Sequence, residues 1–111
     1  MTSCGDVLDI ATGTVLHTVT PTVGGDEIWF NSGDERVYFG GGPDRISVNV
    51  VDALNYTERT TLTVGLLAPP PTHTTHSVAA DRELNRIFVP VTHEGVKVFT
   101  DDRDDDEGPD N

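Results

Sequence analysis

The sequence contains very little cysteine and lysine, and each shortage excludes a class of protein. Cys4 is the single cysteine in 111 residues, so no disulfide can form within the chain. The cysteine content therefore does not indicate whether the protein resides in an oxidising or a reducing compartment. Lys97 is the single lysine beside six scattered arginines, and the formal net charge is −12. Because phosphate contacts need clustered cations, we expect no nucleic-acid partner.

The sequence also lacks a long apolar run. No stretch approaches the roughly 18 apolar residues that a membrane-spanning helix requires. Residues 1–6 contain neither the basic segment nor the apolar segment of a secretory signal. We therefore expect no signal peptide, no transmembrane segment and no membrane partner, and the sequence does not specify a compartment.

Short runs rich in Val, Ile and Thr recur through the chain, separated by Gly, Asn and Asp. β-Branched residues favour strands, and the separating residues favour tight turns. The length suits one small domain. The pattern predicts an all-β chain without a helix longer than two turns and with nine strands, at residues 6–10, 16–19, 27–30, 36–39, 46–52, 60–64, 77–80, 86–89 and 96–100.

The apolar runs repeat. Residues 7–11 align with 50–54 at an offset of 43, and residues 36–39 align with 86–89 at an offset of 50. Residues 48–50 align with 96–98 at an offset of 48. A unit of this length with four short strands is typical of β-propeller blades. The sequence therefore predicts a partial β-propeller of about two four-stranded antiparallel blades.

Several motifs within these units resemble the YVTN-type β-propeller repeat. The matching residues are Asp9-Ile10-Ala11-Thr12-Gly13, Gly24-Gly25, Arg36-Val37-Tyr38-Phe39-Gly40, Gly41-Gly42-Pro43-Asp44, His76-Ser77-Val78-Ala79-Ala80-Asp81 and Asn85-Arg86-Ile87-Phe88-Val89. The resemblance covers residues 5–100 and implies a ring of blades whose strands run A to D from the central channel outward. It implies strands C and D of one blade at residues 6–19, a full blade at 27–64 and a partial blade at 77–100.

A closed propeller typically has about four to eight blades, which is more than these strands supply. We therefore expect the chain to be the C-terminal part of a larger propeller. A truncated reading frame, a split gene product and one chain of an oligomeric ring remain open. In each case the expected partner is the rest of the propeller or another blade-bearing chain.

The blade topology places D–A loops and B–C loops on the same face of a propeller. His73 and His76 fall in a D–A loop, His93 falls in the next B–C loop, and Asp26 is the repeat equivalent of His76. These four residues are the predicted ligand-binding residues, at a metal site, an anionic-ligand site or a general base near the channel mouth. The alternative is that polar residues simply collect in loops. The sequence specifies no cofactor and does not indicate whether a metal ion binds.

The sequence contains no Gly-x-Ser-x-Gly motif, no phosphate-binding loop and no Rossmann glycine pattern. The predicted function is therefore a propeller repeat that acts as a binding or scaffold module without catalysis of its own. The alternative is the C-terminal part of a propeller enzyme, similar to a lactonase or an oxidoreductase, with a channel-mouth site. That alternative rests on fold analogy.

Two further expectations concern single segments. Trp29, in a predicted A strand, is expected in the core between blades rather than on a stacking surface. Residues 101–111 contain seven acids and one Arg. Like charges repel and offer nothing apolar to bury, so this acidic tail is predicted to be disordered.

Overall fold

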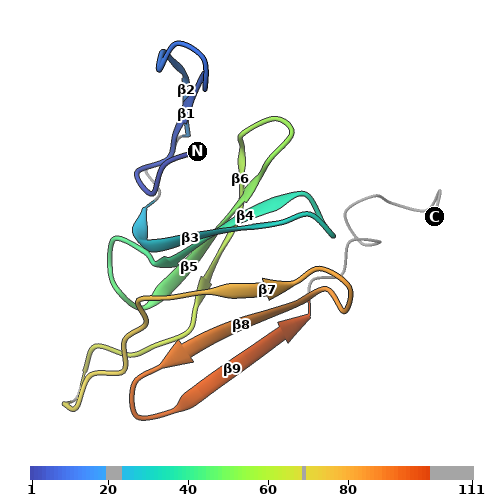
Figure 1. Cartoon of the computed structure of the whole chain (residues 1–111). Helices are drawn as coiled ribbons and strands as arrows, with labels where there is room; N and C mark the ends of the chain where they lie inside the picture. Colours follow the sequence, from blue (N-terminus) through green and yellow to red (C-terminus); the bar gives the residue numbers. More distant parts are fainter. Residues whose placement is uncertain (20–23, 69, 101–111) are drawn as a thin grey trace.

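The computed structural model describes residues 1–19, 24–68 and 70–100, and these contain nine strands and no helix (Figure 1). The all-β prediction and the number of strands are therefore confirmed. The strands are β1 (Asp6–Leu8), β2 (Val15–Thr18), β3 (Gly25–Asn31), β4 (Arg36–Gly41), β5 (Ser47–Asp52), β6 (Glu58–Thr63), β7 (Ala79–Asp81), β8 (Arg86–Val91) and β9 (Gly95–Thr100).

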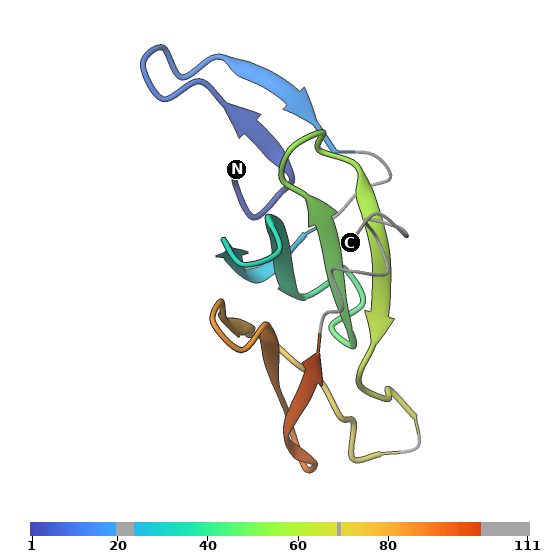
Figure 2. The ribbon, with the colours of Figure 1, turned by 90° about the vertical axis from the view of Figure 1, so that its right-hand side faces the viewer.

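The strands form three antiparallel sheets, none of which closes on itself. β1 and β2 make an N-terminal hairpin, β3 to β6 make a four-stranded central sheet in sequence order, and β7 to β9 make a three-stranded C-terminal sheet. Figure 2 shows the hairpin at one end of the molecule, the central sheet in the middle and the C-terminal sheet at the other end. The central sheet therefore has a neighbour on each side.

The two inner strands of the central sheet, β4 and β5, are buried on both faces because they carry apolar side chains at consecutive positions. On the sheet's first face, Val37, Phe39 and Val51 pack with Val19, which follows the hairpin. On its second face, the buried residues of the central sheet pack against those of the C-terminal sheet; they are Tyr38, Val48 and Val50 from the former and Ile87, Val89 and Val91 from the latter. Neighbouring residues on one strand point to opposite faces, so β4 contributes to both cores.

The same turn joins the paired strands four times. Each turn begins with an Asp or Asn whose side-chain oxygen accepts the backbone N–H two residues later; these are Asp9, Asn31, Asp52 and Asp81. The fourth residue after each one has a positive φ, at Gly13, Glu35, Tyr56 and Asn85. The backbone thus repeats the regularity that the sequence offsets predict.

Three strands, β1, β5 and β7, are shorter than predicted, and β7 also begins two residues late. Residues 77–80 were expected to form a strand, but β7 begins at Ala79. The two preceding residues contact the central sheet instead of extending β7: the Ser77 hydroxyl donates to Glu27 Oε1, and the Val78 N–H donates to the same oxygen at 3.4 Å.

Trp29 is not a core residue, and that expectation is wrong. Its side chain is 42% exposed. Trp29 pairs with Tyr38 and therefore shares its face. The nearest strand of the C-terminal sheet is β7, which is only three residues long and supplies only the small side chain of Ala80 to the core on that side. The predicted disordered tail at 101–111 lies outside the described residues.

Candidate functional site

Three loops meet on one side of the molecule, at the left of Figure 1. They are residues 42–46 between β4 and β5, the described residues 64–68 and 70–78 between β6 and β7, and 92–94 between β8 and β9. Backbone hydrogen bonds connect them: Val64 N–H donates to Ile46 O at 2.7 Å, and Thr92 N–H donates to Thr74 O at 2.9 Å. The loops form one continuous surface that spans the central and C-terminal sheets, and we call it the loop face.

Asp26, the second residue of β3, contacts His76 on the loop face. Asp26 Oδ2 is 2.6 Å from His76 Nδ1, with 67% and 52% of the two side chains exposed. The next residue on each segment makes a second link, between Glu27 and Ser77. Both pairs are separated by 50 residues, so repeat-equivalent positions of adjacent sheets bind one another.

His73 belongs to a second cluster. Its Nδ1 lies 2.7 Å from Glu94 Oε2, and its ring lies 5.7 Å from the ring of His93. Lys97 Nζ lies 2.8 Å from the other oxygen of Glu94 and also donates to the carbonyl of Val64 at 2.8 Å. The hydrogen bond from Lys97, followed by the contact with His73, lowers the pKa of Glu94 below its ordinary value.

The four predicted residues therefore fall into two groups on one face, Asp26 with His76 and His73 with His93. Within the described residues no three His, Cys, Asp or Glu side chains are arranged to hold a metal ion. A zinc site needs about three or four protein ligands. The Asp26 carboxylate can orient the imidazole of His76 so that its other nitrogen faces solvent as a base or a ligand.

Glu94 and Lys97 were not among the predicted site residues. The position of Glu94 directly after His93, in the loop between β8 and β9, was the available signal. Lys97, the third residue of β9, follows Glu94 by three positions, and its link to Val64 crosses between sheets. That contact depends on how the sheets stack, so sequence spacing does not reveal it.

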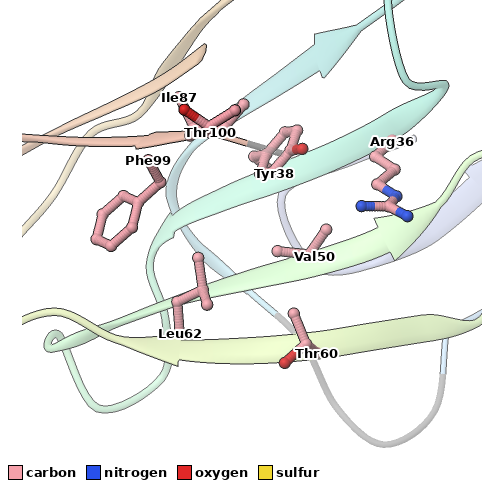
Figure 3. Close-up of a pocket in the computed structure, with 8 residues that line it drawn as sticks. All are labelled: Arg36, Tyr38, Val50, Thr60, Leu62, Ile87, Phe99 and Thr100. Atoms are coloured by element: carbon pink, nitrogen blue, oxygen red, sulfur yellow. The ribbon is translucent and has the colours of Figure 1, made fainter. Parts of the chain in front are cut away.

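A small pocket lies between the central and C-terminal sheets, at the ends of the strands remote from the loop face. It encloses about 160 Å³. Figure 3 shows Tyr38, Val50 and Leu62 from the central sheet around it, with Phe99 and Thr100 from β9. Arg36 supplies its charged group. None of the four predicted residues lines this pocket.

Comparison of the chain with known protein families, curated proteins and solved structures finds no match. In the part of the chain that the structure describes, no helix is long and apolar enough to cross a bilayer. The function therefore has to be argued from the stacked sheets and the loop face.

Proposed function

We propose that the chain is a propeller-type repeat module of the YVTN kind, which binds a partner through its loop face and has no catalysis of its own. One observation carries the proposal: backbone hydrogen bonds connect the three loops, so that they form one surface across adjacent sheets. A repeat stack fixes such loops on a rigid scaffold, and loops of that kind commonly carry binding residues.

The stacking of the sheets supports the repeat part of the proposal. The central sheet has four strands in sequence order, with a two-stranded sheet before it and a three-stranded sheet after it. The central and C-terminal sheets pack face to face through β-branched and aromatic residues, and Val19, which follows the hairpin, packs on the other face of the central sheet. This order and packing agree with consecutive blades whose strands run from A to D.

Photo-crosslinking tests binding at the loop face. A photoreactive amino acid is placed at His93 on that face, or at Glu83 in the β7–β8 turn on the opposite side. In an extract of the source cells we expect position 93 to give a product of defined mass that position 83 does not give. An excess of unmodified chain, added as a competitor, should abolish this crosslinked product. A competitor chain with His73, His76 and His93 changed to alanine should leave the product in place. Equal products from both positions would contradict the proposal.

The contact between Asp26 and His76 favours a second candidate, the channel-mouth site of a propeller enzyme. The imidazole of His76 and the carboxylate of Asp26 can each ligate a divalent ion. We test this candidate by changing His76 and Asp26 to alanine, one at a time, and measuring zinc and manganese binding by calorimetry. The enzyme candidate predicts that each change weakens ion binding at least tenfold. Unchanged ion binding in both variants would eliminate it.

A further inference from the structure

β9 is an edge strand, although its repeat equivalent lies inside a sheet. Residues 96–98 of β9 align with residues 48–50 of β5 at an offset of 48. β5 pairs with β4 on one side and with β6 on the other. Within the residues that the structure describes, β9 pairs with β8 alone. The C-terminal sheet therefore lacks a strand that corresponds to β6.

The backbone of β9 presents hydrogen-bonding groups on its free edge. Pro90 of β8 pairs with Val96, and because proline has no N–H, this pair cannot exchange the two backbone hydrogen bonds that alternate pairs of an antiparallel ladder make. The N–H and C=O groups of Val96, and of Val98 two residues later, therefore point away from β8. The central sheet agrees: the Val64 N–H donates to Ile46 O at 2.7 Å, and hydrogen-bonded pairs recur at every second residue, so the equivalent groups of β5 point at β6.

β9 lacks the features that usually protect an edge strand, which include a proline, a bulge and an exposed charge. Residues 95–100 contain no proline, and their pairing with β8 is regular. Lys97 is the single charged residue of β9, and its Nζ is held by Glu94 and by the carbonyl of the residue that follows β6. Val96 and Val98 remain 62% and 54% exposed. The edge is therefore apolar as well as open.

The sequence after β9 does not suit the missing strand. At the offset of 48, β6 corresponds to Asp106-Glu107-Gly108-Pro109-Asp110-Asn111. This segment has no β-branched or aromatic residue and contains glycine and proline, so it is a poor strand former. Residues 101–111, which follow β9 directly, carry seven acids and one arginine. A strand that runs antiparallel to β9 begins beside these acids, and cations that precede such a strand would be attracted to them.

We propose that β9 binds an extended, basic segment of another polypeptide, which adds to the C-terminal sheet as a fourth, antiparallel strand. Main-chain hydrogen bonds to Val96 and Val98 supply affinity, and the side chains opposite these two valines pack beside them. In the central sheet, Leu62 and Thr60 occupy the equivalent places on β5. The partner segment therefore has apolar or β-branched residues at alternate positions, preceded by Lys or Arg.

The probe is a fluorescein-labelled peptide that carries the sequence of residues 58–64 after two added lysines. Fluorescence anisotropy measures its binding to the full chain, and we expect the binding to saturate. N-methylation of the peptide's leucine, equivalent to Leu62, blocks a hydrogen bond to β9 and should weaken binding about tenfold or more. N-methylation of the threonine before it, equivalent to Thr61, is the matched control. The N–H of that threonine points away from β9, so the affinity should change by less than about twofold.

A second peptide tests the charge, and two variants of the chain test the edge. A peptide with two glutamates in place of the added lysines should bind about tenfold more weakly or worse at low salt, and added salt should narrow the difference. Val98→Pro removes an N–H that points away from β8, where an edge strand accommodates proline, and should weaken binding of the lysine peptide about tenfold or more. Val98→Thr keeps the N–H and the β-branched shape and should bind like the unmodified chain.

Circular dichroism and thermal melting establish that each variant is folded, and Val96→Pro replaces Val98→Pro if that variant does not fold. A folded chain that binds no peptide, or that binds the two N-methylated peptides equally, would overturn the proposal. Equal binding of the lysine and glutamate peptides at low salt, or of the lysine peptide to Val98→Pro and the unmodified chain, would also overturn it. Self-association that is lost in Val98→Pro would show that a second copy occupies the edge instead. The proposal does not depend on a partner at the loop face, and crosslinking from His93 in Val98→Pro tests that partner separately.

Discussion

The two junctions between sheets differ in how completely they are filled. Between the central and C-terminal sheets, Tyr38, Val48 and Ile87 are essentially inaccessible to solvent. Between the hairpin and the central sheet, Val37 and Phe39 are buried but Phe30 is exposed beside a recess of about 430 Å³. The central sheet presents alternating apolar residues to both sides. The difference therefore arises from the neighbour, since a two-stranded hairpin covers less of a four-stranded sheet than a three-stranded sheet does.

The largest expected effect compares an aromatic residue at each junction. Tyr38→Ala deletes a buried ring and the hydrogen bond from its hydroxyl to Asp34, and it should lower the free energy of unfolding by about 3–5 kcal/mol. Phe30→Ala at the open junction should cost about 1 kcal/mol or less, because half of that ring is already in water. Urea denaturation at low protein concentration measures both values. Equal costs at the two junctions would show that the recess is closed in solution.

A smaller effect concerns backbone contact at the filled junction. A Cβ at Gly40 would lie 2.6 Å from the carbonyl carbon of Ser77, which belongs to the segment before β7. Gly40→Ala must therefore separate two backbones and should cost about 1–3 kcal/mol. Gly24→Ala, just before the central sheet, is the matched control: its Cβ would meet only Ser3 O, at 3.3 Å. We expect the Gly24→Ala variant to have a melting temperature close to that of the unmodified chain. A similar loss of stability in the Gly40→Ala and Gly24→Ala variants would contradict the comparison.

Much of the fold follows from local sequence. Alternation of apolar residues predicts which side of β4 and β5 each residue occupies, and the offset of 50 aligns Asp26 with His76, which the structure finds in contact. Whether that contact forms a site stays a prediction. The exposure of Trp29 was not predictable in this way, because it depends on where β7 begins. Likewise, the link from Lys97 to Val64 depends on the distance between sheets.

The smallest expected effect concerns the surface contacts that cross the filled junction at the loop face. Glu94 lies between Lys97 and His73. The hydrogen bond from Lys97, and then that from His73, holds the pKa of Glu94 below its ordinary value of 4.5. Between the lowered pKa and 4.5 the folded state binds fewer protons at this carboxyl than the unfolded state does, so stability rises with pH in that interval.

The stabilising contribution of Glu94 is therefore present in full above pH 4.5 and is lost as the pH falls through the lowered pKa of the folded protein. Glu94→Gln removes the titration and keeps the shape of the side chain. We expect its melting temperature to lie slightly below that of the unmodified chain at pH 7 and to converge with it in strong acid. Raising the salt concentration at pH 7 should also narrow the gap, because surface ion pairs are screened. Glu83→Gln, in the turn on the opposite side, is the control. If the difference in melting temperature between Glu94→Gln and the unmodified chain stays constant across the pH range, the charge of Glu94 does not stabilise this junction.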